Sequence, residues 1–366
     1  MSSEKRDVGM KGKWDIGWGI EIRCNMNCEF CYSKEVRQPG SEINGTVYKN
    51  FIDKNADYIS SINYGTGENA LSEEWFQIVE YIGKNYPSIR QALTTNGYIS
   101  AACQDSKKLE IFSKHIDEVD ISLDFAQRER HNKFRGNPDA YDMAIAAFKL
   151  CSDYKKQTTL VFLGTNEVVQ HHNLEGLFEI AHKHHAYLRT NIYRPTQGID
   201  EKTQKYVLDY SSLLEMLKWV SNNHKVIKVS DRLLAAVLFQ EKVEDFTGYS
   251  SLRILGDGSI TPSTYLISEK YRKYNISDNV LLNEMEFSKE IARECIPKRC
   301  LDCSIGELCR GGTFDRRLLW YGTLDEQDPY CPHRHQEADT KGIVLSADKN
   351  FNSIHDSYLP TMFFAY

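Results

Sequence analysis

The stretch that decides the fold is Cys24-Asn-Met-Asn-Cys28-Glu-Phe-Cys31, which follows the apolar, strand-like run 18–22. It places three thiols close together, and neither a histidine nor a further cysteine lies nearby. A closed zinc site normally takes four ligands. Three thiolates suit a cubane iron–sulfur cluster that leaves one iron open for another ligand. A structural zinc site that borrows a distant ligand is the alternative.

This loop resembles the cluster loop of radical S-adenosylmethionine (radical SAM) enzymes. Its spacing is Cys24-x3-Cys28-x2-Cys31, with Phe30 before the last cysteine and Tyr32 after it. The resemblance implies a [4Fe–4S] cluster on these cysteines, whose open iron is chelated by S-adenosyl-L-methionine (SAM). It implies further that SAM is cleaved reductively to a 5′-deoxyadenosyl radical, which abstracts a hydrogen atom from a substrate. In such enzymes the cofactor carries the chemistry and the protein supplies orientation.

Short apolar runs alternate with segments of helical period over the first 200 residues. Strands are expected over residues 17–23, 58–64, 91–95, 118–123, 159–163 and 188–193, with helices over residues 73–85, 141–154 and 174–185. Six such alternations predict an α/β fold with a parallel sheet, curled into a partial (β/α)6, TIM-like barrel. Functional residues of such folds gather at the C-terminal ends of the strands.

The turn after the second expected strand resembles a SAM-binding segment of the family. Residues 64–69 read Tyr-Gly-Thr-Gly-Glu-Asn and are similar to the family's Gly-Gly-Glu-Pro, with Thr66 in place of the first glycine and Asn69 in place of the proline. The resemblance implies that Gly67 and Glu68 hold the amino group of the methionine moiety. An ordinary strand-to-helix turn is the alternative.

The next two strand ends supply further expected contacts with SAM. Asn96 lies in a Thr-Thr-Asn-Gly signature near the cofactor, although an Asn-Gly turn explains it equally well. The resemblance implies that Ser122 and Asp124 face the cofactor sugar and that Arg135 pairs with the methionine carboxylate. The planar fork of arginine matches a carboxylate. A direct pair between Asp124 and Arg135 at the barrel rim is the alternative.

The last two strands are expected to complete the cofactor site. Leu160 belongs to an apolar strand that we expect under the adenine, and Arg194 follows the sixth strand as a candidate contact for cofactor or substrate. Asp257 and Asp278 are candidate general bases, with ordinary turn residues as the alternative. Cys103 and Cys151 are candidate hydrogen donors, for which a buried structural thiol is the simpler interpretation.

A second cysteine group has the spacing C-x2-C-x5-C-x21-C at Cys300, Cys303, Cys309 and Cys331, which is compatible with zinc. A Gly-Asp-Gly hairpin signal upstream and the Cys-Arg-Gly-Gly turn at 309–312 instead resemble the SPASM domain, which carries auxiliary [4Fe–4S] clusters in radical SAM enzymes.

The complete SPASM pattern holds two auxiliary clusters, and this chain departs from it. Ser263 and Thr313 stand where two of its cysteines are expected. The resemblance therefore implies one auxiliary cluster, fully ligated by the four cysteines of the second group. Cys295 is the thiol that could replace a missing ligand.

The chain divides accordingly into four expected parts. These are a radical SAM barrel over residues 1–200, a helical linker over 201–247, a SPASM domain over 248–335 and a tail over 336–366 that packs on the barrel.

Composition excludes several classes of protein. The net charge is −6, and no stripe of Lys and Arg suggests nucleic-acid binding. No apolar run approaches the roughly 18 residues of a membrane span. The polar start at residues 1–13 predicts no signal peptide, so we expect a cytoplasmic protein.

Three functions fit this sequence. SPASM-containing enzymes mostly modify ribosomally made precursor peptides by crosslinking, epimerisation or backbone cleavage, which is the first hypothesis. The second is a dehydrogenase or epimerase of a sugar, aminoglycoside or amino acid, and the third is a zinc-dependent binding protein. Few residues precede the first expected strand, so we expect a leader peptide to dock on the barrel or on a separate recognition protein. The resemblance also implies an electron donor such as flavodoxin or ferredoxin.

Overall fold

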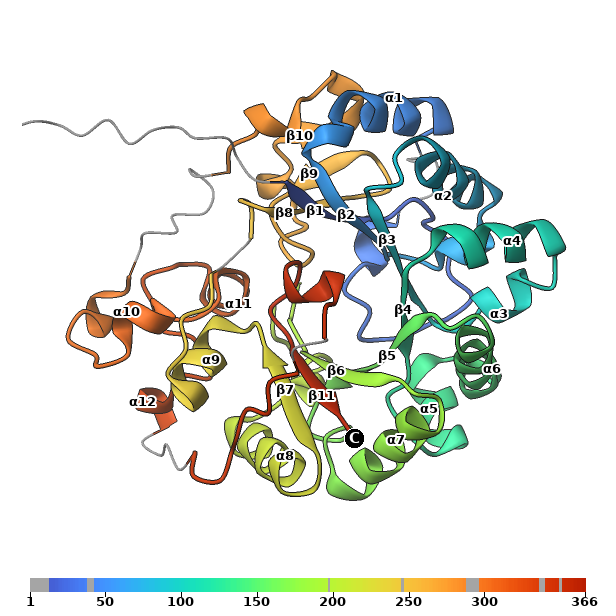
Figure 1. Ribbon diagram of the computed structural model, residues 1–366. Coiled ribbons are helices and arrows are strands. Elements are labelled where there is room, and N and C mark those ends of the chain that lie inside the picture. The colour runs from blue at the N-terminus through green and yellow to red at the C-terminus, as the bar shows by residue number, and fades with distance from the viewer. Residues whose placement is uncertain are drawn as a thin grey trace, which may run out of the picture.

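The computed structural model describes residues 13–37, 43–196, 198–244, 247–287, 296–335, 340–348 and 351–366. One 11-stranded sheet organises the molecule, in the order β10-β9-β8-β1-β2-β3-β4-β5-β6-β11-β7 (Figure 1). The strands are β1 Trp14–Trp18, β2 Ile59–Tyr64, β3 Arg90–Thr95, β4 Glu118–Ser122, β5 Gln157–Gly164, β6 Tyr187–Ile192, β7 Lys225–Val229, β8 Ser251–Ile254, β9 Ser259–Thr261, β10 Tyr274–Asn275 and β11 Met362–Ala365.

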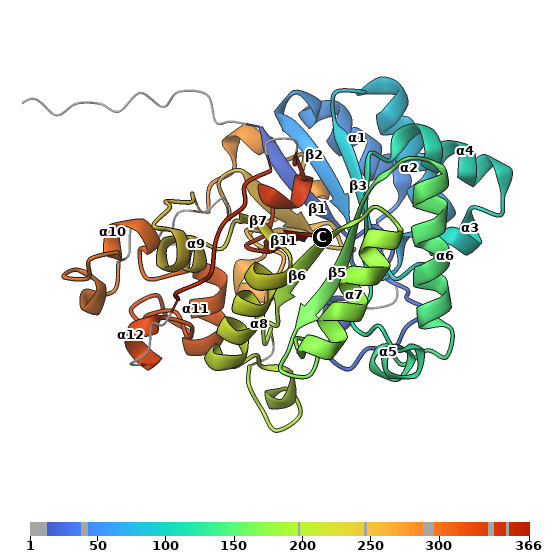
Figure 2. The same ribbon diagram turned by 60° about the horizontal axis from the view of Figure 1, so that its bottom comes forward.

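Helices cover the outer side of this sheet. The α-helices of the described residues are α1 Gly45–Asn55, α2 Glu73–Asn85, α3 Ile99–Ala102, α4 Ser106–His115, α5 Arg128–Arg135, α6 Ala140–Asp153, α7 His171–Lys183, α8 Tyr210–Asn223, α9 Arg232–Phe239, α10 Gly306–Cys309, α11 Phe314–Tyr321 and α12 Pro332–His335. Strands β1 to β6 pair in sequence order and in parallel. Figures 1 and 2 show α1, α2, α4, α6 and α7 around the outside of these strands. The predicted α/β fold is confirmed.

Helix α2 illustrates how local sequence sets these elements. Ser72 accepts a hydrogen bond from the backbone N–H of Trp75 and so caps the first turn. Trp75, Phe76, Val79 and Ile82 recur at helical spacing and are buried. The apolar face of α2 and the cap at its first turn explain why the observed bounds of the helix equal the predicted ones, 73–85.

The first strand lies earlier than the sequence indicates. It spans Trp14–Trp18, whereas residues 17–23 were expected. The N–H of Gly19 still donates to the backbone carbonyl of Ile254. Further on, the N–H of Glu21 donates to Asn69 Oδ1, and the N–H of Arg23 donates to Glu21 Oε1. These side chains replace the partners that a neighbouring strand would provide, so the apolar run continues without ladder pairing.

Both flanks of the six-stranded core come from the second half of the chain. Strand β8 pairs in parallel with β1 and forms an antiparallel hairpin with β9. Strand β11 lies between β6 and β7 and is antiparallel to both. The region expected as a helical linker, 201–247, thus also contributes a strand of the sheet, β7.

The second cysteine group lies in a compact segment that contains α10, α11 and α12, beside α9 (Figure 1). Arg316 of α11 joins it to the sheet, because its guanidinium bonds both Asp328 and Asp231, the residue that caps α9. Cys295 lies outside the described residues. Within the part of the chain that the structure describes, every helix is too short or too polar to traverse a bilayer.

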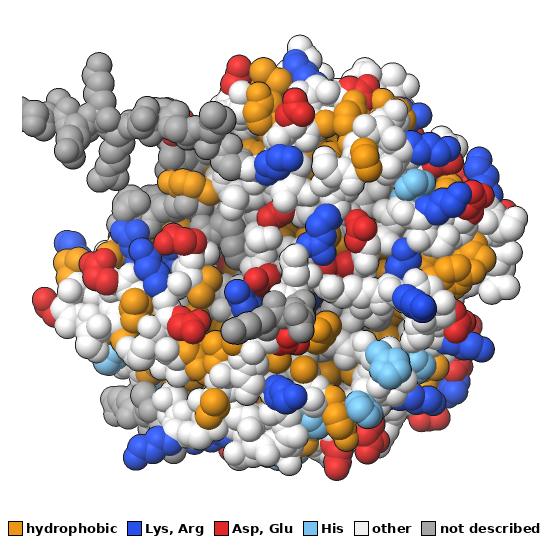
Figure 3. All heavy atoms as spheres, in the orientation of Figure 1, with side chains coloured by type: hydrophobic (Ala, Val, Ile, Leu, Met, Phe, Trp, Pro, Cys, Tyr) orange, Lys and Arg blue, Asp and Glu red, His pale blue; other side chains and the backbone are white. Residues whose placement is uncertain are grey.

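The face in Figure 3 carries interspersed basic and acidic side chains, with no broad basic area.

Candidate functional site

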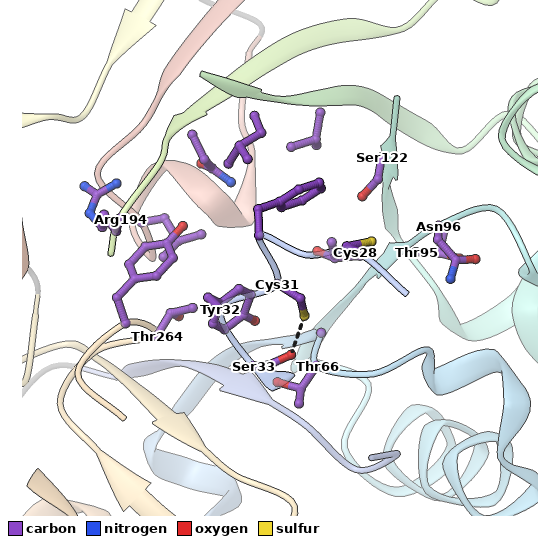
Figure 4. Close-up of a pocket in the computed structure, with 18 of the residues that line it drawn as sticks. Cys28, Cys31, Tyr32, Ser33, Thr66, Thr95, Asn96, Ser122, Arg194 and Thr264 are labelled. Atoms are coloured by element: carbon purple, nitrogen blue, oxygen red, sulfur yellow. Dashed lines mark hydrogen bonds between the residues drawn. The ribbon is translucent and has the colours of Figure 1, made fainter. Parts of the chain in front are cut away.

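A cavity opens at the C-terminal ends of the parallel strands. The cysteine loop lines one part of it, with Cys24, Cys28 and Cys31, and residues from β2 to β6 line the walls. Arg253 of β8 and Tyr358 of the tail line it as well. Figure 4 shows Cys28 and Cys31 near the middle of this group of residues. Both halves of the chain therefore contribute to one cavity.

Hydrogen-bonding groups lie beside Cys24 and Cys31. The N–H of Met26 lies 3.4 Å from Cys24 Sγ, and Asn96 Nδ2 lies 3.7 Å from the same sulfur. Cys31 Sγ lies 3.4 Å from Ser33 Oγ and 4.0 Å from Arg37 Nη2. Donors and a cation at these positions stabilise negative charge on sulfur, as a thiolate ligand requires.

Burial opposes ionisation of the Cys24 and Cys28 thiols. Burial raises the pKa of Cys24, and it raises the pKa of Cys28 to about 11, an effect that Arg135 opposes. A metal would have to displace these protons on binding, so uptake releases protons and weakens at low pH.

Gly67 and Glu68 lie beside the cysteine loop. Gly67 has φ +60°, and a Cβ there would lie 2.3 Å from the carbonyl oxygen of Glu21 and 2.5 Å from that of Arg23, so glycine is required. The N–H of Glu68 donates to the carbonyl of Arg23. Gly67 lines the cavity, which brings this turn against the cysteine loop.

The Glu68 carboxylate points into the protein and supports the neighbouring turn. It accepts hydrogen bonds from Thr95 Oγ1 and, at 2.8 Å, from the N–H of Asn96. Burial raises its pKa to about 7. Since Asn96 in turn contacts Cys24 Sγ, Glu68 acts on the cysteine loop through Asn96.

Asn96, Ser122 and Arg135 line the cavity (Figure 4 labels the first two), whereas Asp124 lies behind it. Asp124 Oδ2 accepts from Arg135 Nε at 2.6 Å, and Oδ1 accepts from the N–H of Leu163 at 2.9 Å. The alternative expectation of an Asp124–Arg135 pair therefore describes the structure. Asp124 is fully buried and positions both Arg135 and the end of β5.

Leu160 is fully buried, and the cavity is lined by the three residues that follow it, Val161, Phe162 and Leu163. Tyr32 and Arg194 also line the cavity. Arg194 is buried, and its Nε lies 3.2 Å from a carboxylate oxygen of Asp315. This ion pair brings α11 to the end of β6.

Sequence reasoning missed His355, which lies in the tail and lines the same cavity. It is fully buried, and its Nδ1 lies 3.0 Å from Asp120 Oδ2, whereas its Nε2 has no partner. Burial lowers its pKa to about 3, so the ring is neutral and offers one free nitrogen to the cavity. No local pattern marks a lone histidine so far along the chain.

The predicted general bases lie elsewhere. Asp257 occupies the β8–β9 turn, where it accepts from the N–H of Ser259 and pairs with Arg272 at 3.2 Å. Asp278 lies in a short 3-10 turn. Cys103 and Cys151 are buried, and burial raises the pKa of each to about 12. None of these four residues lines the cavity described above.

The structure brings the four cysteines of the second group together. Burial raises the pKa of Cys309 to about 11, with further contributions from Cys300, Cys331 and Cys303. The N–H of Asp328 donates to the carbonyl of Gly311, which fixes the segment before Cys331 against the turn after Cys309. His333 Nε2 lies 3.4 Å from Cys303 Sγ, a contact that the cysteine spacing did not indicate.

Ser263 and Thr313 are buried in a polar network. Ser263 Oγ lies 3.4 Å from Asp315 Oδ2, and the N–H of Thr313 donates to Asp328 Oδ2 at 3.1 Å. Arg316 lies between Asp328 and Asp231, and these carboxylates keep its pKa above its ordinary value. Charged and hydroxyl side chains thus fill the space around both positions.

The family model of the radical SAM superfamily matches residues 22–174, which contain the cysteine loop and strands β2 to β5. The AdoMet-dependent heme synthase of Methanosarcina barkeri is 24% identical over 356 residues, covering 87% of this chain and 96% of that protein. A cysteine-type anaerobic sulfatase-maturating enzyme of Clostridium perfringens is 23% identical over 330 residues, covering 79% of this chain and 85% of that protein.

Among solved structures, Streptococcus suis SuiB bound to its precursor peptide SuiA is similar in fold. The TM-score is 0.66 at 15% identity, and the match covers 88% of this chain and 75% of SuiB. Residues 22–174 therefore form a radical SAM domain, and the domain's family implies a [4Fe–4S] cluster and SAM. The two relatives are named as enzymes.

Proposed function

We propose that this enzyme modifies a ribosomally synthesised precursor peptide at the cavity that the cysteine loop and the tail share. The observation that carries the proposal is that three thiols of one loop face the same cavity as Arg253 and His355, which come from the second half of the chain. A SAM site and a substrate site thus adjoin. The similarity to SuiB, solved with a peptide, and to a sulfatase-maturating enzyme supports a peptide as the substrate.

The donor set fits an iron–sulfur cluster better than zinc. Among the described residues, no three cysteine sulfurs lie within 4.8 Å of one another. Tetrahedral zinc, with Zn–S bonds of about 2.3 Å, needs sulfurs roughly 3.8 Å apart. When bound, the cluster and SAM supply a 5′-deoxyadenosyl radical that abstracts a hydrogen atom from the substrate.

The chain's own residues would hold and orient this cofactor. Cys24, Cys28 and Cys31 would ligate the cluster, with Asn96 and Arg37 donating toward two of the sulfurs. The residues proposed to line the SAM site are Tyr32, Gly67, Asn96, Ser122, Arg135 and Val161. Glu68 and Asp124 would act as positioning residues, because protein groups already occupy their carboxylates.

We further propose one auxiliary [4Fe–4S] cluster on Cys300, Cys303, Cys309 and Cys331, within a SPASM domain over residues 248–335. The barrel of residues 1–200 and the tail of residues 336–366 would hold the reaction site between them. The polar network around Ser263 and Thr313 supports a single auxiliary cluster, because paired charges already fill that space.

Anaerobic reconstitution tests the cofactor assignment. We expect about eight irons per chain, four in each cubane. Replacing Cys24, Cys28 and Cys31 together by serine should remove about four irons and abolish SAM cleavage. The same replacement of the second group should remove the other four. C103A, at a buried thiol outside the cavity, is the control and should keep the full iron content.

The substrate is tested by mass spectrometry of a short peptide encoded beside the gene and co-expressed with the enzyme. A mass change that requires all three cysteines of the loop supports a peptide substrate. The 96% coverage of the heme synthase favours a second candidate, a small molecule. An unchanged peptide, together with SAM cleavage that a small-molecule extract stimulates, would support this second candidate.

A further inference from the structure

Three fully buried arginines line the cavity, and one of them has no counter-ion. Arg189 pairs with Asp120, and Arg194 pairs with Asp315. Arg253, which is 1% exposed, forms no ion pair with any described carboxylate, and its Nε has no hydrogen-bond partner. Its contacts are neutral: Nη1 donates to Tyr358 Oη at 3.3 Å, and Nη2 donates to Thr66 Oγ1.

Neighbouring residues leave room for the Arg253 side chain and fix its position. Gly17 of β1 faces it, and a Cβ at Gly17 would lie 2.8 Å from its Nη1 and 1.6 Å from Tyr358 Oη. Thr66 keeps φ +113°, a conformation that costs a β-branched residue free energy, while its hydroxyl accepts from Arg253. Glycine at one position and a strained threonine at another indicate a specific site.

Hydroxyl groups complete this end of the cavity. Tyr358 Oη bonds Thr264 Oγ1, and Tyr32 lines the cavity on the same side. In Figure 4, Thr264, Tyr32 and Thr66 lie on the opposite side from Ser122 and Asn96. A permanent cation with unused N–H groups, ringed by neutral hydroxyls, has the composition of an anion site.

Energetics require a partner for this cation. Arginine stays charged at every accessible pH, and an unpaired buried charge costs several kcal/mol. A carboxylate suits the planar guanidinium, which can bind both oxygens at once.

We propose that Arg253, with the hydroxyls of Tyr358 and Thr264, binds a carboxylate of the substrate. Arg253, Thr264 and Tyr358 all lie outside residues 22–174, the part that matches the radical SAM model, so the group is assigned to the substrate and not to SAM. The inference rests on the proposed function only in placing the substrate in this cavity.

The test uses the reconstituted full chain, R253Q, and R194Q as the matched control. Removing an uncompensated charge should leave the melting temperature of R253Q equal to or above that of the wild type. R194Q leaves Asp315 buried and unpaired, so it should melt lower. Acetate should raise the melting temperature of the wild type but not of R253Q, and acetamide should raise neither.

A second variant guards against misfolding. R253K keeps the charge but loses the planar fork, so the apparent affinity for acetate should fall about 10-fold. Equilibrium dialysis of SAM should give the same affinity for R253Q and the wild type. A loss of SAM affinity in R253Q, or an acetate effect that persists in it, overturns the proposal. Iron content and SAM cleavage are measured separately, so failure of the proposed function remains distinguishable.

Discussion

Glu68 shows how one buried residue can support the cysteine loop through a neighbouring turn. Its carboxylate holds the turn at Thr95 and Asn96, and Asn96 contacts the Cys24 sulfur. Full burial raises its pKa to about 7 from an ordinary 4.5, so the proton is retained near neutrality. The resemblance implies that Glu68 holds the methionine amino group, and in the structure its carboxylate bonds the turn at Thr95 and Asn96.

This pKa predicts a pH dependence. The folded state holds a proton on Glu68 where the unfolded state is ionised, so the stability from this group is present below about pH 4.5 and is lost as the pH rises through about 7. Compared with E68Q, which mimics the protonated form, the wild type should lose on the order of 2 kcal/mol between about pH 5 and pH 8 in urea unfolding. If the free energy of unfolding had the same pH dependence in the wild type and in E68Q, the prediction would be contradicted.

E68A serves as the second comparison in the same measurement. It leaves the Asn96 N–H and the Thr95 hydroxyl buried without an acceptor, so it should cost about 1–3 kcal/mol per group at every pH. A smaller and pH-dependent loss of the free energy of unfolding in E68A would instead indicate that water occupies the space left by the carboxylate.

Single residues could be predicted where spacing carries the chemistry. The two cysteine groups are visible because their separations are short and regular. His355 and Arg253 were missed, because each reaches the cavity through an element far along the chain and has no local pattern. Asp124 and Leu160, which we expected to contact the cofactor, are not among the residues that line the cavity, since strand position alone does not determine toward which side a residue faces.

At the scale of elements, β11 has the largest effect on the architecture. It joins β6 and β7 by antiparallel pairing, and the fully buried Phe364 packs between β5 and α7, near Phe162 and Phe178. The tail thereby joins the edge strand β7 to the parallel strands and carries His355 and Tyr358 into the cavity.

We expect F364A to destabilise the protein by about 3–5 kcal/mol, since it opens a cavity in a packed core. Y366A, two residues further on, is the control: Tyr366 is 53% exposed, so its loss should cost less than about 1 kcal/mol. Urea unfolding measures both variants. Equal losses would mean that β11 is held by its backbone pairing alone.

The predicted elements agree best where an apolar run is bounded by turn residues on both sides. Strands β2 to β6 and helix α2 lie within two residues of their predicted bounds for this reason. Strands β7 and β11 were missed, because five- and four-residue strands give weak periodicity and their partners are distant in the chain.

At the scale of the whole molecule, one buried arginine ties the second cysteine group to the sheet. Arg316 donates to Asp328 at 2.8 Å and to Asp231 at 2.6 Å, and all three side chains are buried. The two carboxylates and one cation make a network that tolerates removal of no single member.

R316Q should therefore lower the free energy of unfolding by about 3–5 kcal/mol, because two buried carboxylates lose their cation. R128Q is the control, since the Arg128–Asp142 pair is half exposed and should contribute less than about 1 kcal/mol. Urea unfolding, followed by tryptophan fluorescence, measures both variants. A loss in R316Q no larger than in R128Q would show that apolar packing alone docks the segment.

The position of β11 also shapes the kinetics of folding. Its pairing with β6 closes a loop that contains β7 and the whole cysteine-rich segment, so this contact has a high contact order and forms slowly. Until it forms, β6 and β7 each present an open strand edge, the kind of surface that recruits other chains into aggregates. The yield of folded protein should thus depend on slow synthesis or on chaperones that protect the edges of β6 and β7 until residues 362–365 pair with them.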